Sequence, residues 1–140
     1  MLEAVRPVSD IEYKSIQPFI PSGKDYALAR GFFTELGFVE QWENNGIAGF
    51  ACGNCRFLIQ RYDDEEFASN LMMKLGVPNL DACWIMIQAK SLETNFPGVR
   101  VRPPTNFPWG REINFIDPAG VCWHVMEQQT MLDRPAKSAA

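Results

Sequence analysis

The sequence lacks the features that mark several large functional classes. Its 140 residues contain no run approaching the ~20 consecutive apolar residues that a membrane-spanning helix needs. The 13 Lys and Arg residues are scattered and are outnumbered by 17 Asp and Glu residues, so the basic cluster typical of nucleic-acid or anionic-membrane binding is missing. The first ten residues, MLEAVRPVSD, hold no apolar run that could serve as a secretory signal. We therefore expect a cytoplasmic protein that binds neither nucleic acid nor membrane.

Histidine and cysteine, which supply many metal ligands and nucleophiles, are scarce. His124 is the only histidine, and the four cysteines include one CxxC pair, Cys52 and Cys55. The second CxxC that a zinc ribbon needs is absent, and the Gly-Asn centre of the CGNC sequence fits a hairpin turn. We interpret the motif as a structural turn with reduced thiols. A redox pair or half of a zinc site is the alternative.

The chain does contain the residue balance of a folded domain. Hydrophobic residues make up 46% and charged residues 21%, and this length suits one hydrophobic core rather than two. We assign residues 1–14 to a polar lead-in, 15–127 to a single domain and 128–140 to a flexible tail. The acidic run 63–66 (DDEE) is expected to be a solvated connector inside the domain.

The hydrophobic pattern gives the same order of elements twice: a strand, a helix and then three strands. In the first half Gly37 ends the helix, and the pair Asn45–Gly46 between two strand-like runs is a strong hairpin signal. In the second half Asn79 is the expected helix cap, and the turn-rich sequence 103–110 (PPTNFPWG) separates two strands. The expected strands are 15–20, 38–42, 47–51, 56–60, 71–75, 99–102, 111–116 and 121–126, and the expected helices are 25–36 and about 79–90.

The two halves align as an internal repeat. Residues 53–60 match residues 120–127, which places Phe57 opposite His124. Each half is too small to be stable alone, so the two are expected to share one sheet or to pack edge to edge. We therefore predict an α+β fold of two βαβββ modules. Their boundaries are about 15–62 and 70–127.

Two segments resemble the signatures of a known superfamily. Residues 25–38 (DYALARGFFTELGF) and 108–123 (PWGREINFIDPAGVCW) are similar to the "D…FY…LGF" and "PWG…DPxG…W" patterns of the glyoxalase/bleomycin-resistance/extradiol-dioxygenase proteins, which have the vicinal oxygen chelate fold. Phe33 stands where Tyr is usual, and the resemblance covers residues 16–127. It implies a curved mixed sheet that forms a cup, and a homodimer whose binding cleft is built from both subunits.

The resemblance also implies four metal-ligand positions in the enzymes of the superfamily: a His or Gln on the first strand of each module and a Glu on the last strand of each. Those positions in this chain are Gln17 or Pro18, Met72 or Leu71, Phe57, and His124. One imidazole and at best one amide, with no carboxylate, cannot hold a divalent cation tightly. We therefore predict no metal and no other cofactor, as in the metal-free, bleomycin-resistance-like branch.

Proteins of that branch bind a bulky ligand stoichiometrically and do not convert it. Our leading hypothesis is therefore a metal-free binder of a small hydrophobic or aromatic molecule, of the resistance or sequestration type. Phe57 and Met72 would make the cup floor an apolar platform. The alternatives are a glyoxalase-like lyase or dioxygenase with an atypical site around His124, and a non-catalytic structural or interaction module.

The candidate ligand-binding residues are Gln17, Phe57, Met72, Lys74, Trp109 and His124. Strand alternation puts Trp123 under the helices and His124 on the cup face, where it is the best candidate for a catalytic base. No Asp or Glu that could orient it is evident, and a half-buried residue bonded to a neighbour is the alternative. Lys74 would pair with an acidic ligand group or else extend to the rim. Trp109 would stack on a planar ligand or else pack in the core or an interface.

Overall fold

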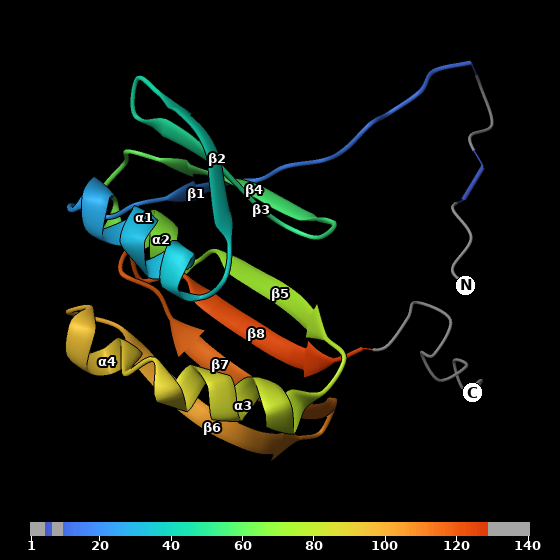
Figure 1. The fold of residues 1–140 in the computed structure, drawn as a ribbon, viewed down its shortest axis with the longest axis vertical. Helices are drawn as coiled ribbons and strands as arrows, with labels where there is room; N and C mark the ends of the chain where they lie inside the picture. Colours follow the sequence, from blue (N-terminus) through green and yellow to red (C-terminus); the bar gives the residue numbers. More distant parts are fainter. Residues whose placement is uncertain (1–4, 7–9, 129–140) are drawn as a thin grey trace.

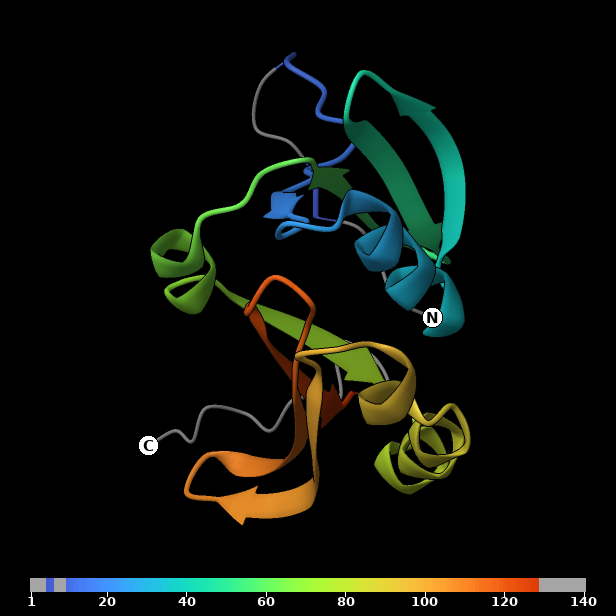
Figure 2. The same ribbon diagram turned by 90° about the vertical axis from the view of Figure 1, so that its left-hand side faces the viewer.

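The computed structural model describes residues 5–6 and 10–128, and these form two modules with the same order of elements (Figure 1). The first contains β1 (Phe19–Pro21), α1 (Tyr26–Glu35), β2 (Val39–Asn44), β3 (Ile47–Cys52) and β4 (Cys55–Gln60). The second contains β5 (Met72–Val77), α3 (Leu80–Ala89), α4 (Leu92–Asn95), β6 (Arg100–Phe107), β7 (Gly110–Ile116) and β8 (Cys122–Glu127). The short helix α2 (Glu65–Ser69) lies at one edge, where the chain passes from the first module to the second (Figure 2).

Each module forms its own four-stranded mixed sheet. The strand orders are β1-β4-β3-β2 and β5-β8-β7-β6. In each sheet the first strand pairs in parallel with the last, and the other neighbours are antiparallel. The predicted α+β class and the two βαβββ modules are therefore confirmed, and the modules have separate sheets rather than a shared one.

The two main helices begin at the expected caps. The side chain of Asp25 accepts a hydrogen bond from the backbone N–H of Leu28 at 2.9 Å, and Asn79 accepts one from Ala82 at 2.9 Å. Each bond satisfies one of the N–H groups that the first helical turn leaves without a partner. Within the described residues, no helix is long and apolar enough to cross a membrane.

Aromatic side chains from both modules meet in one core. The ring of Phe33, on α1, lies 5.1 Å from Phe57 on β4 and 5.3 Å from Trp123 on β8, and the last two are 5.6 Å apart. This core fixes which face of each sheet points inward. Because side chains alternate along a strand, the neighbours Leu58 and His124 point to the opposite face.

The structure corrects the alignment between the two last strands. Phe57 is only 3% exposed and belongs to the core, whereas His124 lies on the outward face. The repeat alignment that placed Phe57 opposite His124 is off by one residue, and a slip of one residue exchanges the two faces of a strand. Leu58 is the first-module residue on the face that His124 occupies in the second.

Two strands, β1 and β6, have boundaries that differ from the sequence prediction by several residues, and the connector contains a short helix that was not predicted. β1 begins at Phe19 rather than at residue 15, because β4 offers parallel partners only to Phe19–Pro21. β6 runs on through the expected turn to Phe107, with a bulge between Arg102 and Thr105. Its two prolines are accommodated because β6 is an edge strand. The acidic connector contains α2, which Asp64 caps.

The predicted termini fall largely outside the part of the chain that the structure describes. The flexible tail was assigned to residues 128–140, of which only Gln128 is described. In the lead-in, residues 1–4 and 7–9 are likewise outside the described ranges. The polar lead-in and the tail therefore stay predictions.

Candidate functional site

A pocket of about 640 Å³ opens on the outward face of the second sheet. It is lined by side chains of β6, β7 and β8, together with the β6–β7 turn and Glu93 of α4. Glu112, Asn114 and Ile116, which line it from β7, alternate with Ile113 and Phe115 of the core, and Phe115 also borders the pocket. The same strands therefore build both the core and the pocket.

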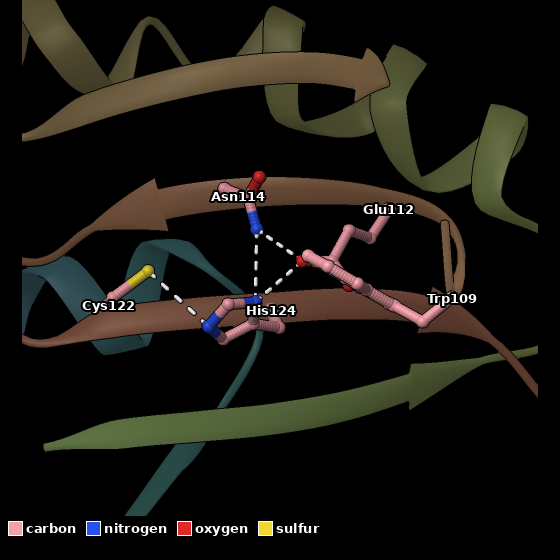
Figure 3. Close-up of polar contacts among 5 residues, drawn as sticks. All are labelled: Trp109, Glu112, Asn114, Cys122 and His124. Carbon is pink, nitrogen blue, oxygen red and sulfur yellow. Dashed lines mark hydrogen bonds and ion pairs between the residues drawn. The ribbon is translucent and has the colours of Figure 1, made fainter. Parts of the chain in front are cut away.

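A buried carboxylate organises the floor of this pocket (Figure 3). Glu112, on β7, is 1% exposed. Its Oε1 lies 2.6 Å from Nδ1 of His124 and accepts a hydrogen bond from Nδ2 of Asn114 at 2.7 Å. Its Oε2 accepts a bond from Nε1 of Trp109 at 2.9 Å. Three donors thus satisfy a charged group that burial would otherwise penalise.

These contacts determine the ionisation of Glu112 and the tautomer of His124. Burial by itself raises the pKa of Glu112, but the hydrogen bonds from His124, Asn114 and Trp109 together bring that pKa below its ordinary value. An ionised carboxylate only accepts hydrogen bonds, so the proton in the 2.6 Å contact belongs to Nδ1 of His124. In the neutral ring, Nε2 then carries a free lone pair.

The thiol of Cys122 lies beside that lone pair. Its Sγ is 3.6 Å from Nε2 of His124, and both side chains line the pocket from β8. Burial raises the pKa of the Cys122 thiol, and the negative charge of Glu112 raises it further. The thiol is therefore protonated near neutral pH, with a hydrogen-bond acceptor in front of it.

An aromatic pair forms one wall of the pocket. Phe107 and Trp109 stack with ring centroids 5.0 Å apart and an interplanar angle of 6°. Phe107 ends β6 and Trp109 lies in the tight β6–β7 turn, after which Gly110 begins β7 with φ of 144°, a conformation that favours glycine. Trp109 is 63% exposed, yet its bond to Glu112 fixes the indole. A planar ligand can stack here without displacing any core residue.

Two cations border the pocket on β6. Arg100 and Arg102 both line it, and the guanidinium of Arg102 lies 6.0 Å from the ring centroid of Phe107. The positive charge of Arg102 also acts on the Cys122 thiol, whose pKa it lowers against the larger opposing effects. The pocket therefore combines an aromatic wall, a cationic edge and a carboxylate–imidazole floor.

The structure brings together two of the six residues suggested by the sequence, Trp109 and His124. Met72 and Lys74 lie on β5, directly opposite Cys122 and His124 in the ladder, so they flank the pocket on the same face. Phe57 is in the core. Gln17 precedes β1 in the first module, where its side chain donates to Oγ of Ser15 at 2.9 Å.

Sequence reasoning missed the residues that give His124 its environment. The expectation that no Asp or Glu orients His124 is wrong, since Glu112 does so at 2.6 Å. A signal was present: in the strand 111–116, Glu112 and Asn114 alternate with apolar residues, and the short turn after this strand leads back into His124. In the β7–β8 ladder Asn114 lies opposite His124, one residue away from the register that a four-residue turn between residues 116 and 121 implies.

The motif at residues 117–120 (DPAG) positions this hairpin. Oδ1 of the buried Asp117 accepts hydrogen bonds from the backbone N–H groups of Ala119, Gly120 and Val121 at 2.9–3.0 Å, and Oδ2 accepts one from Nε1 of Trp123 at 2.9 Å. The turn therefore fixes the register of β7 against β8 and holds Trp123 in the core.

The superfamily's metal site does not fit these side chains. Of the implied ligand positions, Phe57 is in the core and Met72 offers a weak thioether donor, so among these three only Nε2 of His124 is a strong ligand. Among the described residues, no group of three or more His, Cys, Asp or Glu side chains is arranged to hold a metal ion. The arrangement can instead position a proton between His124 and a neighbouring group.

Comparison with known proteins identifies structures that have the same fold. No protein-family model matches the sequence, and no curated protein matches it. Solved structures do match. A bleomycin resistance determinant encoded on the transposon Tn5 has a TM-score of 0.71 and 20% identity, and the match covers 84% of this chain and 100% of that one. The bleomycin-binding protein of Streptomyces verticillus, complexed with copper(II)-bleomycin, has a TM-score of 0.66 and 22% identity, covering 84% and 98%.

A glyoxalase/bleomycin resistance protein/dioxygenase from Nocardioides is also similar, with a TM-score of 0.65 and 17% identity over 93% of this chain and 92% of that one. The fold expected from the resemblance is thus confirmed. At these identities the likeness establishes the fold alone.

Proposed function

We propose that this protein binds a small aromatic or hydrophobic molecule in the β6–β8 pocket without the help of a metal, as a sequestering protein of the bleomycin-resistance type. The observation that carries the proposal is the stack of the half-buried Phe107 with the exposed Trp109 above a floor closed by Glu112 and His124. Stacking and apolar burial supply the affinity for such a ligand, and the few polar groups orient it. The bleomycin-binding and bleomycin resistance proteins of the same fold support this class of ligand. We keep the proposed location in the cytoplasm, where the thiols stay reduced.

The proposed assembly is a homodimer. The outward face of the first sheet carries an apolar row that crosses all four strands: Phe19, Leu58, Gly49 and Trp42 stand opposite one another in the ladder. Phe19 is 50% exposed and Trp42 is 49% exposed. A second copy that covers this row would remove these rings from water. A Trp42→Ser variant should then shift the sedimentation equilibrium toward monomer, whereas the exposed Tyr13→Ser change should not.

Ligand-induced stabilisation tests the binding proposal. A ligand that binds only the native state at 100 times its Kd adds about 2.7 kcal/mol to the free energy of unfolding. We expect a rise in Tm with bleomycin or another aromatic antibiotic, in protein of verified metal content below about a tenth of an equivalent. A Trp109→Ala variant should lose the rise, and Tyr13→Ala should keep it. If no aromatic compound raises Tm, the fold serves a structural or interaction role instead.

One observation favours a second candidate function, a lyase-type reaction that needs no metal. The Glu112–His124 pair has the geometry of an oriented general base, with the free Nε2 facing the pocket. In that case a bound substrate would lose a proton to His124. A His124→Gln variant would then keep ligand binding and lose turnover, which separates catalysis from sequestration.

A further inference from the structure

Cys122, His124 and Glu112 form a chain of three groups within the pocket. Sγ of Cys122 is 3.6 Å from Nε2 of His124, and Nδ1 of His124 is 2.6 Å from Oε1 of Glu112. The order is that of an activated nucleophile: a thiol, a base that can take its proton, and a carboxylate that orients the base. Binding by stacking alone requires no such order.

We propose that Cys122 is a nucleophile that captures electrophilic ligands covalently, with His124 as its general base and Glu112 as the positioning residue. The ligand class is a planar compound with a carbon–carbon double bond conjugated to a carbonyl group. The proposal rests on the proposed function, because the same aromatic wall would hold the ligand over the thiol.

The addition balances without any further reactant. Nε2 of His124 takes the thiol proton while Sγ forms a bond to the β-carbon of the ligand. The π electrons of the double bond move onto the carbonyl as an enolate, and the α-carbon then receives the proton from Nε2. The thiol S–H bond and the C=C π bond are replaced by one C–S and one C–H bond, so nothing is oxidised.

The cationic edge suits this class of electrophile. Negative charge develops on the carbonyl oxygen as the enolate forms, and a guanidinium fixed nearby stabilises that charge. Arg102 lines the same pocket, and its charge already acts on the Cys122 thiol. An electrophile without an oxygen that gains charge would not use this residue.

The base is needed because the thiol is not ionised by itself. Burial and the charge of Glu112 raise the pKa of Cys122, so free thiolate is scarce at neutral pH. The chain holds its own reference thiols: Cys52 and Cys55 are exposed at the β3–β4 turn, remote from any histidine in sequence. These two report the uncatalysed reactivity of accessible thiols under identical conditions.

The test is the alkylation rate of each cysteine, followed by peptide mass spectrometry. N-phenylmaleimide is the aromatic probe, and N-ethylmaleimide is the matched probe without the ring. We expect Cys122 to react about tenfold faster than Cys52 and Cys55 at neutral pH despite its lower exposure, since general-base catalysis contributes about 10²–10⁴-fold. His124→Gln should remove this advantage.

The pH profile needs no variant. Attack by free thiolate gives a rate that rises about tenfold per pH unit below the thiol pKa, whereas attack assisted by a neutral general base does not depend on the thiolate fraction and gives a flat profile. We expect the flat profile for Cys122 and the steep one for Cys52 and Cys55. Glu112→Gln should lower the rate at Cys122 and leave the two reference thiols unchanged.

The outcomes separate this inference from the proposed function. If a Cys122→Ser variant binds aromatic ligands reversibly while wild-type Cys122 is slow or shows the steep profile, the nucleophile is disproved and the binding function stands. A flat, His124-dependent profile with no preference for N-phenylmaleimide over N-ethylmaleimide supports the nucleophile and counts against aromatic recognition by the pocket.

Discussion

The two modules share a topology but differ across the same face of their sheets. In the first module a row of cross-strand neighbours consists of Phe19, Leu58, Gly49 and Trp42. The corresponding row of the second module consists of Lys74, His124, Asn114 and Arg102. One row is apolar and the other is entirely polar or charged. The inward faces, by contrast, both carry apolar residues that meet in one core.

An ion pair in the first module joins its helix to its sheet. The guanidinium of Arg30, on α1, binds both carboxylate oxygens of Glu40, on β2, at 2.7–2.8 Å, and it lies 5.1 Å from the ring centroid of Tyr26. These contacts tie helix to sheet at a half-exposed edge. The comparison indicates that a repeated fold can keep its core pattern in both copies while the residues on the opposite faces of the two sheets diverge.

The largest expected effect follows from a mutation in the aromatic core that the two modules share. Phe33→Ala would empty the position where α1 meets Phe57 and Trp123, and should cost about 3–5 kcal/mol of unfolding free energy. Urea denaturation measures this, with Thr34→Ala on the exposed side of the same helix as the control. Because both modules contact Phe33, the transition should remain single, and two separate transitions would contradict a common core.

The carboxylates of Glu112 and Glu40 should differ in how much they contribute to the free energy of unfolding. Glu112→Ala removes the buried carboxylate to which Trp109, Asn114 and His124 are hydrogen-bonded, and it should cost about 1–3 kcal/mol. Glu40→Ala breaks a half-exposed ion pair and should cost less than about 1 kcal/mol. Urea unfolding of both variants tests the ranking. Equal losses would mean that the two modules use their polar groups alike.

Part of the pH dependence of stability should come from Glu112 in the second module. The folded pKa of Glu112 lies below its ordinary value of 4.5. Its contribution to stability is therefore complete above that value and is lost as the pH falls through the lowered folded pKa. The difference in unfolding free energy between wild type and Glu112→Gln, measured from neutral pH downward, should shrink in this acid range. A difference that stays constant with pH would contradict the assigned shift.

The smallest expected effect concerns Lys74, at one end of the polar cross-strand row of the second module. Lys74 is opposite His124 in the ladder but exposed, so its charge is screened by solvent. Lys74→Met should change the activation free energy for alkylation of Cys122 by less than about 1 kcal/mol, which corresponds to less than about a fivefold change in rate. A larger loss would extend the site onto β5.

The fold was predictable because its signals are local. Asp25 and Asn79 cap their helices through side chains a few residues away, and the DPAG turn is held by Asp117 itself. The site was less predictable because it depends on pairing. The faint similarity between the last strands could not fix a register to one residue, so Phe57 was placed on the wrong face. Glu112 approaches His124 only through the β7–β8 ladder, which the sequence does not show directly.

The order of strands in the second sheet also has a consequence for synthesis. β8 is the last strand of the described chain, yet it lies between β5 and β7 rather than at an edge. On the ribosome, β5 therefore emerges long before the strand that it must pair with, and the sheet stays divided until β8 arrives. The residues that arrive with it include Cys122 and His124, the proposed nucleophile and its proposed base. A nascent or truncated chain that stops before β8 lacks both residues. The proposed reaction of Cys122 is therefore possible only when the sheet is complete.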